Sequence, residues 1–172
     1  YVAMRKDDKA GLVTFNEYFD TFVPASKQVG QMQTLLENLY KQETTFGETD
    51  FSALCGHLGK HVNKRSFLVL YTNFSNMTSL NRQLVYLQQL ARQHRVLVVF
   101  FEDADLKEYI AGKSVTTEDY YRHVIAEKFA FEKRLIVSTL KQHGIYSLLT
   151  TPDKLSIDVI NKYLEMKSRQ LL

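Results

Sequence analysis

The 172-residue sequence has little of several things: one cysteine, no tryptophan, two prolines and seven glycines. The single cysteine, Cys55, excludes a disulfide within the chain and is typical of a reducing compartment or a buried structural thiol. The glycines never form the GxGxxG or GxxxxGK[ST] loops of nucleotide-binding proteins, and no GxSxG nucleophile elbow is present. No apolar run approaches the roughly 20 residues needed to span a bilayer. The sequence therefore lacks the local signatures of these classes of protein.

The charge pattern argues against nucleic acid as a partner. The net charge is only +3, and the lysines and arginines form no basic stripe interleaved with aromatic residues. Apolar residues make up 45% and charged residues 24%, which is ordinary for a globular protein. The chain is long enough for one substantial core, and it contains no internal repeat or linker. We therefore expect a single domain over residues 1–172.

A strand, a helix and a second strand are predicted in the middle of the chain. The runs Phe67–Tyr71 and Val96–Phe101 are apolar without alternation, as in parallel strands that are covered on both faces. The segment between them has apolar residues at helical spacing, and Thr78 or Ser79 can cap its start. Such a crossover fixes the class as α/β. The helical stripe comprises Leu80, Leu84, Leu87 and Ala91, widened by Val85 and Leu90.

The residues before this unit predict two strands and two helices. Ala10–Phe15 reads as a short strand, and Tyr18–Val23 as its antiparallel partner, ended by Pro24. Ser26 is expected to cap a helix that carries leucines on one face. A second helix, capped by Thr49 or Asp50, runs to about His61.

The residues after it predict a long helix, a strand and a last helix. Thr116 to Asp119 has the form of a capping box, and Gly144 stands at the usual position just past a helix end. Ile145–Thr150 is a strand closed by Pro152, and the last helix begins near Leu155. The apolar stripe of the long helix comprises Tyr121, Val124, Ile125, Phe129, Leu135, Ile136 and Leu140.

Oxygen-bearing residues follow the two central strands. In α/β sheets, ligands bind at the carboxyl ends of the strands, and such an oxygen-rich edge suits a hard cation such as Mg²⁺. The alternative is that these loop residues serve only turns and caps. The candidates are Asn73 and Ser75 after the first strand, Glu102, Asp103 and Asp105 after the second, and Thr49 and Asp50 at a helix start.

Four stretches, in order across nearly the whole chain, resemble one family. They are Asp7–Phe15, Glu48–Phe51, Arg65–Asn73 and Asn161–Lys167. With them, the chain resembles the carboxy-terminal part of the von Willebrand factor A-like proteins grouped as domain of unknown function 58. The resemblance implies a Rossmann-like three-layer sandwich with a mostly parallel sheet and a metal-ion-dependent adhesion site at its carboxyl edge.

The resemblance also implies which residues form that site. Thr49 matches its threonine, and Asn73 stands where the family has an aspartate, which keeps a carbonyl oxygen but loses the charge. The DxSxS motif is absent, because the sequence begins after the central first strand that would carry it. Mg²⁺ or Mn²⁺ is then expected only if upstream sequence completes the site. Without that strand, the strands at 12–15 and 67–71 need a re-formed sheet, another copy or upstream sequence.

The function implied by the resemblance is a non-enzymatic interaction or scaffold module. Such bacterial proteins resemble scaffolds that act with MoxR-type AAA+ ATPases, so we expect a cytoplasmic protein, tethered to a membrane only through upstream segments. Two alternatives remain open. One is a structural domain with a decayed site, and the other is a metal-assisted hydrolase that uses Glu102, Asp103 or Asp105.

Overall fold

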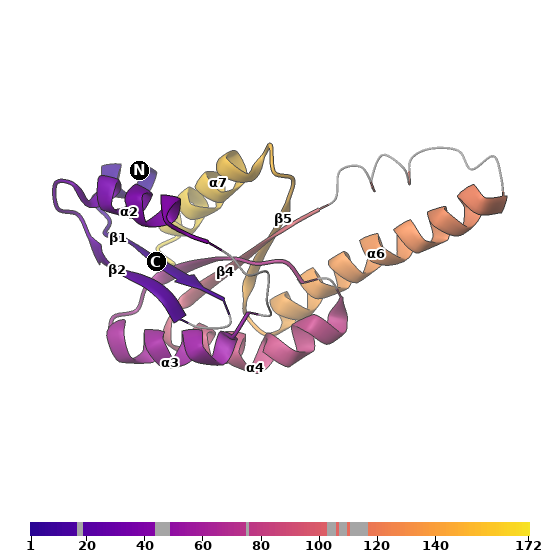
Figure 1. Ribbon diagram of the computed structural model, residues 1–172, viewed down its shortest axis with the longest axis horizontal. Helices are drawn as coiled ribbons and strands as arrows, with labels where there is room; N and C mark the ends of the chain where they lie inside the picture. Colours follow the sequence, from indigo (N-terminus) through magenta and orange to yellow (C-terminus); the bar gives the residue numbers. More distant parts are fainter. Residues whose placement is uncertain (17–18, 44–48, 75, 103–105, 107–109, 111–116) are drawn as a thin grey trace. The chain divides into compact units, whose positions relative to one another are not determined.

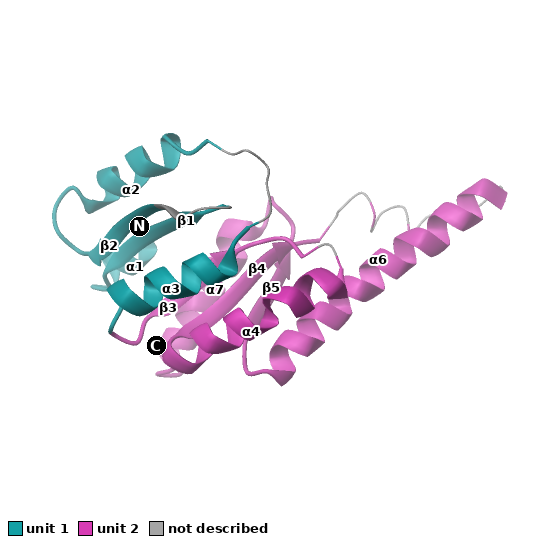
Figure 2. Ribbon diagram, turned by 60° about the horizontal axis from the view of Figure 1, so that its bottom comes forward, with its two compact units in different colours: residues 1–63 teal, residues 64–172 magenta. Residues whose placement is uncertain are grey.

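A computed structural model describes the chain except residues 17–18, 44–48, 75, 103–105, 107–109 and 111–116 (Figure 1). It contains two compact units, residues 1–63 and 64–172 (Figure 2). The described strands form two separate sheets, one of two strands and one of three. The three-strand sheet is parallel and has helices around it, which confirms the mixed α/β class.

The first unit contains an antiparallel pair of strands that follows the short helix α1 (Val2–Arg5). β1 (Ala10–Phe15) has the predicted bounds, but β2 (Phe19–Ser26) continues past Pro24, so the prediction that this proline ends the strand is wrong. Leu12 pairs with Val23 and Ala10 with Ser26, so β2 carries one extra residue at the proline. A bulge needs no ladder hydrogen bond from the proline nitrogen, and this explains why the strand tolerates it.

The first helix of this unit, α2 (Gln31–Tyr40), starts later than predicted. Ser26 is the last residue of β2, and its hydroxyl oxygen accepts a hydrogen bond from the Gln28 N–H instead of capping the helix. The N-cap is Gly30, at a positive φ of 90°. The Gln31 side-chain amide donates to the carbonyl oxygens of Ala10 (2.8 Å) and Pro24 (3.0 Å), which ties the helix start to both strands.

The second helix, α3 (Phe51–His61), begins at the predicted place. Asp50 is its N-cap, and the carboxylate accepts a hydrogen bond of 3.0 Å from the Ala53 N–H. The ring of Phe51 meets that of Phe15 edge-on at 5.4 Å, which joins the helix to β1. Burial raises the pKa of the Cys55 thiol to about 11, aided by the nearby charge of Asp50, so this cysteine is the inert buried thiol that its setting predicts.

Gly11 lies against the bulge so closely that no side chain fits. A Cβ atom there would come within 2.8 Å of the Val23 carbonyl oxygen and 2.9 Å of the Ala25 nitrogen. Gly11→Ala should therefore lower the free energy of unfolding by about 1 to 2 kcal/mol, because backbone must move. Gly56→Ala in α3 is the control: an added Cβ meets nothing within 4 Å, and a gain of up to ~1 kcal/mol is expected. Urea titration that ranks the two variants equally would contradict this account.

The second unit is a parallel sheet in the order β3 (Phe67–Tyr71), β4 (Arg95–Phe101), β5 (Tyr146–Thr150). Its connections are α4 (Met77–Gln93) and α6 (Thr117–Gln142), which lie together on one face of the sheet. The last helix, α7 (Leu155–Ser168), covers the other face (Figure 1).

The core of this unit lies around β4. Residues 96–100 are all buried, which confirms the prediction of a strand covered on both faces. α4 buries Leu80, Leu87 and Leu90 against it, but Val85 is 65% exposed and does not widen the stripe as predicted. No helix in the described parts of the chain is long and apolar enough to cross a membrane.

The start of α4 differs from the prediction. Neither Thr78 nor Ser79 is its cap, because the helix already begins at Met77. Asn76 is the N-cap, and its side-chain oxygen accepts a hydrogen bond of 2.9 Å from the Ser79 N–H. An asparagine three residues before that N–H reaches it directly, and so takes the role expected of the hydroxyl residues.

α6 ends as predicted, although the start of its capping box, Thr116, lies outside the described residues. Gly144 has a φ of 71°, and the Ile145 N–H donates to the Leu140 carbonyl oxygen at 3.0 Å. The Gly144 N–H donates to the Lys141 carbonyl oxygen at 3.0 Å, which completes a Schellman motif, and Leu140 and Ile145 are both buried. Of the predicted apolar stripe, only Ile136 and Leu140 are buried. The other five members are exposed: Tyr121, Val124, Ile125, Phe129 and Leu135.

Candidate functional site

The carboxyl ends of the three parallel strands meet at one edge of the second unit. Asn73 follows β3 and Glu102 follows β4. The Glu102 backbone N–H donates to the carbonyl oxygen of Thr150, the last residue of β5, at 2.9 Å. The Thr72 backbone N–H donates to the carbonyl oxygen of Val99 in β4 at 3.0 Å. These bonds hold the ends of the three strands side by side. The sheet therefore brings Asn73 and Glu102 to one edge, as the sequence predicted.

A lysine from α6 occupies this edge. Lys133 Nζ donates to Asn73 Oδ1 at 2.6 Å and to the Phe74 carbonyl oxygen at 2.8 Å. The same ammonium lies 5.6 Å from the centre of the Phe100 ring, which is fully buried. Burial lowers the pKa of the lysine. The arrangement is a partly desolvated cation held by two oxygens and an aromatic face.

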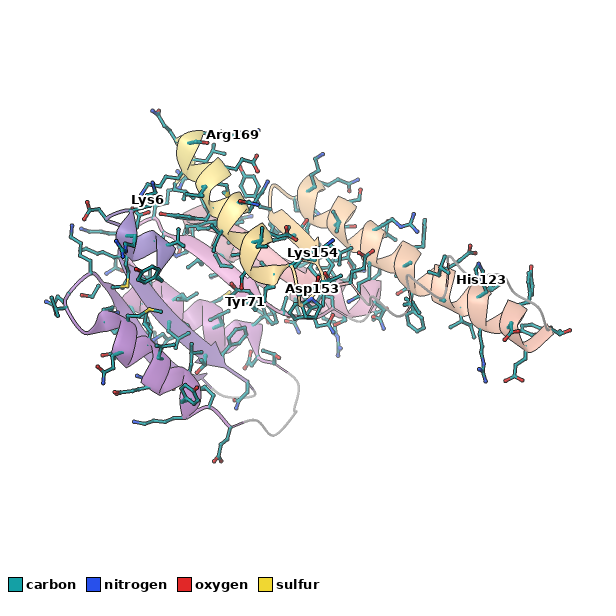
Figure 3. All side chains as sticks on the ribbon, turned by 90° about the horizontal axis from the view of Figure 1, so that it is seen from above. Lys6, Tyr71, His123, Asp153, Lys154 and Arg169 are labelled. Carbon is teal, nitrogen blue, oxygen red and sulfur yellow. The ribbon has the colours of Figure 1, made fainter. Side chains whose placement is uncertain are left out.

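A second polar contact lies at the carboxyl end of β5, on the same edge. Thr150 is buried, and its hydroxyl donates to Asp158 Oδ2 at 2.5 Å. Asp158 lies in the first turn of α7, where a carboxylate is favoured by the helix dipole. Tyr71, Asp153 and Lys154 also lie at this end of the sheet (Figure 3). The edge is thus polar along its length, with Lys133 as its hydrogen-bonded cation.

The other predicted site residues have different positions. Thr49 and Asp50 precede α3 in the first unit, and the Asp50 carboxylate serves as the cap of that helix. The turn-and-cap alternative therefore describes what Asp50 does. Ser75, Asp103 and Asp105 lie outside the described residues.

The described residues do not form a divalent-cation site as they stand. Asn73 Oδ1, the oxygen expected to face a metal, accepts a hydrogen bond from an ammonium group, whose positive charge opposes a second cation nearby. Within the described ranges, no group of three or more histidine, cysteine or acidic residues could hold a metal ion. The predicted metal ligation by Thr49 and Asn73 stays a prediction for a site that other residues would have to complete.

Sequence reasoning missed Lys133. The residue lies 60 positions from Asn73, so no local motif joins them. One signal was available: Lys133 shares a helix face with Phe129, Ile136 and Leu140, and a charged residue on an apolar face needs a polar partner. Finding that partner requires knowing that α6 runs back along the carboxyl end of β3.

Comparison with known proteins gives one match. Residues 1–117 match the family model described as "Protein of unknown function DUF58". No curated protein and no solved structure matches the chain. The matched range contains three of the four stretches on which the resemblance was based, together with β1 to β4. Since the match covers more than half of the sequence, this chain belongs to the DUF58 family.

Proposed function

We propose that this chain is a non-enzymatic protein-interaction module with a von Willebrand factor A-like, Rossmann-like arrangement, in which the Lys133 ammonium stands in for a metal ion. The observation that supports the proposal is the 2.6 Å hydrogen bond from Lys133 Nζ to Asn73 Oδ1. Asn73 stands where the resembled family has its metal-binding aspartate. At this position the chain has exchanged a carboxylate and a divalent cation for an amide and an ammonium.

The chemistry of the exchange favours binding of a partner's carboxylate. A metal at an adhesion site presents positive charge to an acidic side chain of the bound protein. Lysine has three N–H donors, and Asn73 and Phe74 account for two of them. The third is suited to a carboxylate, and the apolar ring of Phe100 beneath the ammonium strengthens the interaction by keeping water away.

The proposed partner is a MoxR-type AAA+ ATPase, with the module acting as a scaffold in the bacterial cytoplasm and tethered through upstream segments where these exist. In this proposal, an acidic residue on the ATPase meets Lys133. The hydrolase alternative depends on Asp103 and Asp105, which lie outside the described residues, so it remains a prediction.

The first test is binding to a purified MoxR-type ATPase encoded in the same genome, with and without EDTA. Wild-type protein should bind equally well in both conditions, and Lys133→Met should bind at least tenfold more weakly, because it loses a charge-assisted hydrogen bond. Lys141→Met is the matched control, since Lys141 is an exposed lysine of the same helix. Loss of binding in EDTA would contradict the proposal, and absence of any binding would favour a structural domain with a decayed site.

Calorimetric titration of Mg²⁺ and Mn²⁺ tests the metal directly. No binding heat is expected for wild type, since Lys133 already holds Asn73. Asn73→Asp should show none either, because the new carboxylate pairs with the ammonium. Micromolar binding by wild type would mean that a metal, and not Lys133, supplies the charge.

A further inference from the structure

α6 exposes large apolar side chains along much of its length. In Figure 1 its amino-terminal part runs well past the sheet of its own unit, and in Figure 3 His123 lies in that part. Tyr120 and Phe131 are each 61% exposed, and Val124 and Leu135 are exposed as well. Several large apolar side chains exposed on one helix suggest an interaction surface, because leaving such area in water is unfavourable.

Six residues of this helix form a continuous seam. At 100° per residue they fall within an arc of about 100°. They are Tyr120, Val124, Glu127, Lys128, Phe131 and Leu135. Apart from the adjacent pair Glu127 and Lys128, they are spaced three or four residues apart over roughly 22 Å, which is typical of helices that pair lengthwise. The buried residues Ile136 and Leu140 and the site residue Lys133 lie on a different arc, so the seam is free of the core and of the carboxyl edge.

The pattern of the seam is symmetric about its centre, and from this we propose that α6 pairs antiparallel with α6 of a second copy of this chain. A two-fold axis between residues 127 and 128 places Tyr120 opposite Leu135 of the second copy, and Val124 opposite its Phe131. The same axis places Glu127 opposite Lys128 of the second copy. One arrangement thus matches apolar with apolar and acid with base at every seam position.

Charge complementarity favours a second copy of this chain as the partner of the seam over a different protein or a membrane. A two-fold interface is self-complementary, so each contact occurs twice. Glu127 and Lys128 therefore make two opposite-charge contacts across the antiparallel pair, whereas a parallel pair would set like charges together. The Glu127 side chain is 60% exposed, with its carboxylate 3.5 Å from His123 of its own helix, so it is placed on the surface where the second copy would meet it.

Sedimentation velocity over a range of concentrations tests the proposal. Wild type should show a monomer–dimer equilibrium, and Phe131→Ser should be monomeric. Because the Phe131 side chain is exposed, both proteins should unfold at the same temperature at concentrations low enough for the wild type to be monomeric. Ile125→Ser, an exposed apolar residue off the seam, should dimerise as wild type does. Glu127→Lys should raise the dimer Kd roughly tenfold by reversing two contacts, and Glu127→Lys/Lys128→Glu should restore it. A wild-type monomer at all concentrations would overturn the proposal, as would binding to phospholipid vesicles by the monomer alone.

Cross-linking tests the direction of pairing. Tyr120→Cys and Leu135→Cys proteins, mixed and oxidised, should form a disulfide between the two species and little within either alone. A Tyr120→Cys protein that readily cross-links to itself would place like positions together and overturn the antiparallel arrangement. Cys55 is buried and interferes little.

Discussion

Replacing Lys133 with glutamate is expected to lower the free energy of unfolding by about 3 kcal/mol. The wild-type ammonium donates to Asn73 Oδ1 and to the Phe74 carbonyl oxygen at 2.6 and 2.8 Å. A carboxylate has no N–H to offer and would face both oxygens, so attraction is replaced by repulsion. Hydrogen bonds from a charged donor contribute about 1.5 to 3 kcal/mol each, and the sum is reduced because the lysine is only partly buried.

Two variants separate charge from packing in this experiment. Lys133→Met keeps an aliphatic stem over Phe100 and should lose only about 1 to 2 kcal/mol. Lys141→Glu places the same charge change on an exposed position in the last turn of α6, where the helix dipole accounts for less than ~1 kcal/mol. Urea unfolding at neutral pH that gives equal losses for Lys133→Glu and Lys141→Glu would show that the contact at the carboxyl edge does not stabilise the unit.

The strands were predictable because their signal is local. β1 and β3 have the bounds expected from their apolar runs, and β4 extends its predicted run by Arg95 alone. An apolar run without alternation indicated each strand, but only β4 is buried along its length. In β3 only Leu70 is buried and Tyr71 is exposed, so the expected burial on both faces was too strong for this strand. The N-cap Asp50 was predictable for the same reason, because a capping side chain acts on an N–H three residues away.

The incorrect predictions in the first unit concern residues whose structure depends on a second segment of the chain. Pro24 was expected to end β2, but Gly11 on the facing strand leaves room for the bulge that absorbs it. Ser26 was expected to cap a helix, yet strand pairing with Ala10 holds it in β2. The bulge at Pro24 and the pairing of Ser26 both depend on the facing strand β1, which the propensity of a single residue cannot reveal.

The candidate site divides in the same way. The position of Asn73 and Glu102 at one edge was predictable, because parallel strands carry the residues that follow them to a common edge, whereas their role in a site stays a prediction. Lys133 was missed, because only the path of α6 brings it to that edge. Val124 and Leu135 were assigned to the core stripe of α6 but are exposed, because a helix with apolar residues on most of its circumference gives no sequence signal for which face is inward.

His94 is a buried histidine whose ring nitrogens both lack a hydrogen-bond partner among the described residues. It is the C-cap residue of α4, is 2% exposed, and has its pKa lowered from 6.5 by burial. Its neutral ring still carries one N–H, and leaving a buried donor unpaired costs about 1 to 3 kcal/mol. The polar ring is therefore a source of instability even before it titrates.

His94→Leu should consequently raise the free energy of unfolding, and the gain should grow on acidification. Because the folded pKa is lowered, the unfolded chain takes up the proton first as the pH falls below 6.5, so wild-type stability decreases from there downward. By about pH 5 this titration accounts for at most ~2 kcal/mol, added to the gain of about 1 kcal/mol or more from removing the unpaired N–H.

His94→Gln separates the effect of the titration from that of the unpaired N–H, since it abolishes the titration but keeps a polar group in the same place. Urea unfolding from about pH 8 to pH 5 should therefore show a smaller acid loss for both variants than for wild type, with a gain at neutral pH for leucine alone. An acid loss in His94→Leu as steep as that of wild type would mean that His94 is already protonated in the folded protein, or that other groups govern its acid sensitivity.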